Sequence, residues 1–61
     1  MRKYTLIIEC NDGRILSWEL NEERYVKMLY DMWEQHKVMF NVKSGQLYNN
    51  WTQSTVCSFG M

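Results

Sequence analysis

The tripeptide at positions 11–13, Asn-Asp-Gly, constrains the fold of this chain more than any other feature, because it separates two runs of alternating apolar residues. A turn of this composition between alternating runs is a strong signal for a β-hairpin. A two-residue loop would oppose Leu6 to Glu19 and mix the two faces. A three-residue loop, with Gly13 in the left-handed conformation, gives one apolar face made of the pairs Tyr4–Leu20, Leu6–Trp18, Ile8–Leu16 and Cys10–Arg14. The sequence therefore predicts the three-residue loop, since a sheet covered on one side needs one apolar face.

A helix is predicted to follow the hairpin, from about Asn21 to about His36. Asn21 is a suitable N-cap, and the glutamates at 22 and 23 complement the positive end of the helix dipole. His36 and Lys37 complement the negative end. No glycine marks the stop, so the last turn of the helix is not fixed by the sequence.

The segment from Val38 to Trp51 predicts a second hairpin that turns at Ser44-Gly45. Residues 52–61 have strand-like composition without a clear preceding turn, so they form a fifth strand or an arm. We therefore expect a single α+β domain over residues 1–61, a ββαββ fold with the helix packed on one face of an antiparallel sheet. About 60% of the unfolded chain's surface can be buried at this length, so the core is small.

The predicted helix is apolar around about 200° of its circumference, more than the ~100° stripe of a surface helix. One explanation is that a small core wraps the helix closely, with Met28 and Tyr30 at its rim. The other is that a flank containing Met28, Tyr30 and Met32 contacts a partner, where methionine adapts to irregular surfaces.

Residues 44–61 contain no Asp, Glu, Lys or Arg. Exposed edge strands are normally protected by lysine, proline or a β-bulge, and we expect none of these here. An unprotected edge is an aggregation hazard, which a second copy of the chain would remove. We therefore expect a homo-oligomer, with Val56 and Phe59 joining the helix flank in the interface.

The sequence contains no motif that indicates catalysis. Cys10, Cys57 and His36 are too few, and too irregularly spaced, for a zinc site. Glu9 and Glu19 are expected on the solvated face of the first hairpin, where they act as solubilising charges. No glycine-rich phosphate loop is present. We expect a protein that is not an enzyme, without catalytic residues, metal or cofactor.

A polar and aromatic stretch is the candidate ligand site. Amides and hydroxyls provide paired donors and acceptors, and Trp51 provides a stacking face of the kind that binds a nucleobase. Arg14, with Arg2 and Lys3, can supply positive charge for a phosphate. The alternative is that Trp51 belongs to the core opposite Val38. The candidate ligand-binding residues are Tyr48, Asn49, Asn50, Trp51, Thr52, Gln53 and Arg14.

The balance of seven basic and seven acidic side chains disfavours binding to duplex nucleic acid, which usually requires a basic excess. No apolar run is long enough to span a membrane, and the N-terminus does not resemble a signal peptide. We expect a cytoplasmic protein without a membrane partner. Two cysteines in that setting are expected to be free thiols.

In its small size, neutral charge, aromatic and Met-rich composition and lack of an enzyme motif, the chain resembles the very small proteins that phages encode to disable bacterial defences. Some of those proteins sequester nucleotide signals between subunits, and others block a host enzyme by direct contact. The resemblance implies the host cytoplasm as its location and assigns no site residue. We therefore expect a homo-oligomer that sequesters a small nucleotide-like signal. The alternatives are an inhibitor that contacts a host protein, an accessory subunit docked on a larger partner, and a small nucleic-acid-binding regulator.

Overall fold

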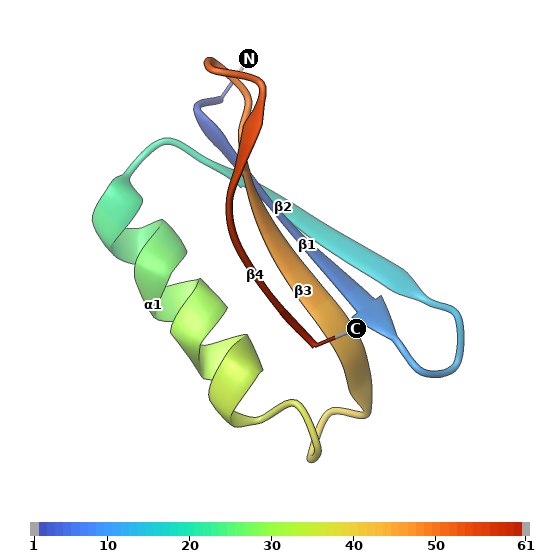
Figure 1. The fold of residues 1–61 in the computed structure, drawn as a ribbon. Helices are drawn as coiled ribbons and strands as arrows, with labels where there is room; N and C mark the ends of the chain where they lie inside the picture. Colours follow the sequence, from blue (N-terminus) through green and yellow to red (C-terminus); the bar gives the residue numbers. More distant parts are fainter. Residues whose placement is uncertain (1, 61) are drawn as a thin grey trace.

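Four antiparallel strands form one sheet, and a single helix covers one of its faces (Figure 1). The structure is a computed structural model that describes residues 2–60. The elements are β1 (Tyr4–Cys10), β2 (Ile15–Leu20), α1 (Glu23–Gln35), β3 (Val42–Asn49) and β4 (Ser54–Gly60). The order of the strands across the sheet is β2-β1-β3-β4, so each hairpin occupies one half of the sheet. The predicted α+β, ββαββ architecture is confirmed.

The first hairpin has the predicted register throughout, with Leu6 opposite Trp18 and Ile8 opposite Leu16. The Cys10 N–H donates to the Arg14 carbonyl at 2.8 Å, and the Gly13 N–H donates to the Cys10 carbonyl at 3.1 Å. Gly13 has a φ of +93°, which a residue without a Cβ adopts readily. The three-residue loop is confirmed.

The helix lies close to its predicted range, but the predicted N-cap is wrong. Glu22 occupies the cap position and makes no capping hydrogen bond with its side chain. The Asn21 side chain instead accepts a hydrogen bond from the Lys3 N–H at 3.0 Å. Asn21 therefore ties the start of the helix to the first strand, rather than satisfying the free N–H groups of the helix.

The predicted limits of the second hairpin are wrong. Ser44-Gly45 lies inside β3, and the turn falls at residues 50–53. The tail is β4, so the sheet has four strands and the fifth strand does not exist as a separate element. Residues 38–41 form a turn that follows the helix, and they take no part in the sheet.

Gly45 explains this error, because its missing side chain serves packing instead of a turn. Gly45 is paired with Phe59 on β4, and a Cβ on residue 45 would overlap the Phe59 ring. The ring lies across β3 and meets Tyr30 edge-on, with 5.4 Å between the ring centres. A glycine inside a strand often marks such a close approach.

Two bulges interrupt the ladders of β3. Lys43 is the extra residue where the β1–β3 register shifts, and Val56 is the extra residue where the β3–β4 register shifts. The expectation that the charge-free segment lacks a bulge is therefore wrong. Since a bulge bends an edge strand and breaks its regular pairing, β4 carries one of the usual protections against edge-to-edge association.

The core lies between α1 and the central strands. Tyr30 is only 7% exposed, so its predicted place on an exposed helix flank, or at the rim of the core, is wrong. No helix within residues 2–60 is long and apolar enough to cross a membrane. The buried residues are Tyr4, Leu6, Ile8, Cys10, Val26, Tyr30, Val42 and Leu47.

Candidate functional site

Three consecutive apolar residues are exposed in the turn between α1 and β3. Val38 is 89% exposed, Met39 73% and Phe40 40%. We call these three residues the apolar tip. The turn projects beyond the end of the sheet in Figure 1. Runs of three or more exposed apolar residues weaken solubility and are expected only where they serve a function.

Hydrogen bonds organise the backbone of the turn that carries the apolar tip. The Phe40 N–H donates to the His36 carbonyl at 3.0 Å, and the Asn41 N–H donates to the Val38 carbonyl at 3.2 Å. Asn41 has a φ of +58°, which asparagine tolerates better than most residues. Its side chain accepts a hydrogen bond from the Asn11 amide at 2.9 Å, so the first hairpin turn braces this turn.

Phe40 anchors the apolar tip, while Val38 and Met39 extend into solvent. The Phe40 ring lies 5.0 Å from the Trp33 ring, and Trp33 in turn lies 5.4 Å from Trp18. The indole N–H of Trp33 is buried and has no hydrogen-bond partner among residues 2–60. This row of aromatic rings connects the apolar tip to the first hairpin.

Two of the residues predicted for an interface are also exposed on the helix. Met28 and Met32 lie four residues apart and leave an apolar stripe open to solvent. Val56 on the far edge of the sheet is exposed too, whereas Phe59 is half-buried against Tyr30. The predicted interface residues therefore do not form one surface on a single copy.

The amides of the predicted ligand site are engaged in holding the turn between β3 and β4. The Asn49 side chain accepts hydrogen bonds from the N–H groups of Trp51 and Thr52, at 2.9 and 3.1 Å. The Asn50 side chain donates to the Arg2 carbonyl and to the Thr5 hydroxyl, at 2.9 and 2.7 Å. These amides act as structural groups in the turn.

Trp51 is 65% exposed at this turn, so its alternative place in the core opposite Val38 is wrong. The Lys3 ammonium lies 5.6 Å from the centre of the Trp51 ring, within cation–π range. Gln53 and Thr52 are exposed beside it, and the Thr52 and Ser54 hydroxyls share a 2.8 Å hydrogen bond. Tyr48 is half-buried, and its pairing with Thr5 places it on the uncovered face of the sheet.

Arg14 lies at the opposite end of the sheet from Trp51. Asn49, just before Trp51, pairs with Tyr4 at one end of β1, whereas Arg14 bonds to Cys10 at the other end. At about 3.3 Å per residue, these ends are roughly 20 Å apart. Arg14 pairs with Asp12 at 2.8 Å, and the hydrogen bond from the Arg14 N–H lowers the pKa of Asp12. Arg14 and Trp51 therefore cannot hold one small ligand within a single copy.

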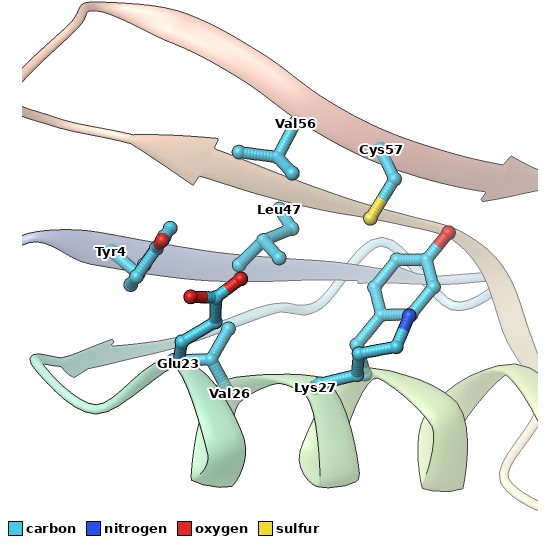
Figure 2. A pocket seen from close by; sticks show the side chains of 8 residues that line it. Tyr4, Glu23, Val26, Lys27, Leu47, Val56 and Cys57 are labelled. Atoms are coloured by element: carbon cyan, nitrogen blue, oxygen red, sulfur yellow. The ribbon is translucent and has the colours of Figure 1, made fainter.

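A small cavity opens between α1 and β4, beside the Val56 bulge. Figure 2 shows Val56 and Cys57 on the strand side and Glu23 and Lys27 on the helix side. Its volume is about 110 Å³, below the ~300 Å³ at which drug-sized ligand pockets begin. Burial, followed by a hydrogen bond with Cys57, raises the pKa of Tyr30 to about 12. The cavity is too small to enclose a nucleotide.

The sequence interpretation missed the apolar tip because Val38, Met39 and Phe40 have strand-forming composition. Short apolar runs do not by themselves distinguish strand from exposed turn. No group of three metal-ligating side chains gathers anywhere in residues 2–60. Comparisons with protein-family models, curated proteins and solved structures each found no match to the chain.

Proposed function

We propose that the chain is a non-enzymatic binding protein that acts by direct contact with another protein, through the apolar tip. This function corresponds to the expected alternative of an inhibitor that contacts a host protein. The observation that carries the proposal is the run of three exposed apolar side chains on a braced turn. Exposed loop residues positioned by a rigid scaffold commonly carry binding function.

The geometry of the tip suits insertion into a hydrophobic groove on the partner. Because its backbone is already fixed by hydrogen bonds, binding loses little further conformational entropy. Methionine at the centre of the tip fits irregular apolar surfaces. Phe40 provides a packed base, so that Val38 and Met39 are presented together.

We expect Met39→Asp to weaken binding to the partner by roughly 30-fold or more, as the loss of about 2 kcal/mol at a central contact implies. Folding should be nearly unaffected, within about 0.5 kcal/mol, because the side chain is exposed. A photo-crosslinking amino acid at position 39, in cells of the natural host, identifies the partner. Calorimetry with the purified partner then measures the affinity of the native and Met39→Asp chains.

Position 53 is the matched control for crosslinking, since Gln53 is exposed in a turn at the opposite end of the sheet. Trp51→Ala is the matched control for affinity, because it removes an exposed apolar side chain far from the tip. Equal affinity of the Met39→Asp and native chains for the crosslinked protein would contradict the proposal. So would crosslinking only from position 53.

A second candidate function, sequestration of a nucleotide-like ligand, is favoured by the exposed Trp51 ring with Lys3 over it. If a nucleobase stacks there, Trp51→Ala should weaken binding roughly 5- to 150-fold, since stacking contributes about 1–3 kcal/mol per base. Titration of cyclic dinucleotides against tryptophan fluorescence measures this. Absence of any fluorescence or melting-temperature change at millimolar ligand would exclude it.

A further inference from the structure

The two edges of the sheet differ in regularity. β4 is broken by the Val56 bulge, whereas β2 pairs with β1 without any register shift. β2 contains neither lysine nor proline, and Glu19 is its only charged residue. A regular strand at the edge of a sheet is a ready template for pairing with another strand. β2 is therefore the edge strand that is better suited to pair with a strand of another molecule.

The hydrogen-bond phase of β2 determines which backbone groups face outward. The Cys10 N–H bonds to the Arg14 carbonyl, which makes these two residues a hydrogen-bonded pair. Since such pairs alternate along an antiparallel ladder, Leu16, Trp18 and Leu20 direct their N–H and C=O groups towards β1. Ile15, Ser17 and Glu19 direct theirs away from the sheet.

An apolar flank of the helix lies on the same side as this edge. Glu23, Lys27 and Tyr30 line the cavity beside β4, so they mark the flank of α1 that faces that strand. At about 100° per residue, Tyr25 and Met32 fall on the other flank, towards β2. Both are exposed, and the contact between Trp33 and Trp18 places this flank over β2.

We propose that β2 pairs antiparallel with β2 of a second copy of this chain, with Ser17 on the two-fold axis. This register joins all outward N–H and C=O groups of Ile15, Ser17 and Glu19 in both copies. The two neighbouring registers pair fewer groups: with Trp18 on the axis the groups of Ile15 lie outside the paired segment, and with Leu16 on the axis those of Glu19 do. The result is one continuous eight-stranded sheet, with the two helices on the same face.

Charge is compatible with this arrangement, because Arg14, which lies beside the acidic end of the second copy, is already neutralised by its ion pair with Asp12. Glu19 faces Ile15 of the second copy, so no two carboxylates are directly opposed. The flanks that carry Tyr25 and Met32 then face each other across the two-fold axis, above the paired strands.

The paired edges bury a small area. A six-residue strand is about 20 Å long and the sheet-plus-helix layer about 20 Å thick, so the dimer buries at most roughly 800 Å² in total. That area is at the low end for specific interfaces. We therefore expect a weak dimer that dissociates on dilution.

Sedimentation of the full chain, from low micromolar to submillimolar concentration, tests the proposal. We expect the mass to rise from 7.5 kDa towards twice that value. Ser17→Pro should keep the chain monomeric and folded, because the N–H that it removes points outward and proline is tolerated there on an edge strand. Val56→Lys, on the opposite edge, is the matched control and should leave the dimer intact.

Charge variants test the register. Ile15→Glu should weaken the dimer roughly tenfold. The new carboxylate would face Glu19 of the other copy, and this repulsion occurs at two symmetric places. Adding Glu19→Lys should restore the affinity. A mass of 7.5 kDa at every concentration would overturn the proposal. So would a dimer that Val56→Lys abolishes and Ser17→Pro leaves intact. Met39→Asp should not change the dimer, so failure of the tip proposal and failure of this one are distinguishable.

Discussion

Replacing Gly45 with valine is expected to destabilise the domain by about 1–3 kcal/mol, the range for overpacking a filled site. The new side chain would occupy the space of the Phe59 ring, which is held in turn by Tyr30. Strand propensity alone predicts the opposite sign, because valine is favoured in strands and glycine is not. Chemical denaturation followed by circular dichroism measures the change.

Two further variants isolate the cause of this loss. Gln46→Val changes the next residue, which is exposed on the other face of β3. The exposed hydrogen bond that it removes, from Gln46 to Thr55, is offset by the strand propensity of valine, so stability should change by no more than about 0.5 kcal/mol. Phe59→Ala combined with Gly45→Val should destabilise less than the sum of the two single changes, since the overlap disappears with the ring. Simple additivity would show that Phe59 is not the obstacle.

Folding stability is expected to fall with rising pH between 10 and about 12 because of Tyr30. Below pH 10 the phenol is protonated in both the folded and the unfolded chain, so its contribution is fully present. Above pH 10 the unfolded chain releases the proton, while burial keeps the folded chain protonated until about pH 12. The folding equilibrium constant should therefore fall by at most roughly tenfold per pH unit, most steeply in the middle of this interval.

Tyr30→Phe is the control for this pH dependence, because it keeps the buried ring and removes the titrating hydroxyl. Urea midpoints measured across the interval should fall less steeply for Tyr30→Phe than for the native chain. Tyrosinate absorbance should show one fewer late-titrating phenol in the variant. Parallel pH profiles for the two proteins would refute the assignment to Tyr30.

The first half of the fold could be predicted in detail because its signals are local. The turn residues, the alternation of apolar side chains and the length of the loop all select one register for the first hairpin. The second hairpin could not be placed, because Gly45 gives a turn signal while its role is set by Phe59, fourteen residues away. The actual turn, at residues 50–53, is held by side-chain amides that resemble a binding motif in sequence.

The candidate site was predictable only in part, for a similar reason. The helical period indicated that Met28 and Met32 could be exposed, but it could not distinguish them from Tyr30, which Phe59 and Cys57 cover. Exposure of the apolar tip depends on where β3 begins. That boundary depends on the Lys43 bulge and on the bracing of Asn41 by Asn11, neither of which has a sequence signature.

The strand order has a consequence for the folding pathway. Each hairpin forms from neighbours in sequence, but the central pairing of β1 with β3 joins segments separated by the whole of β2 and α1. Closing that long loop costs conformational entropy before any apolar surface is buried. We therefore expect formation of the β1–β3 contact to limit the folding rate. Kinetic φ-values should then be highest for Leu6 and Ile8, which lie in the centre of β1, and lowest for β4 at the periphery.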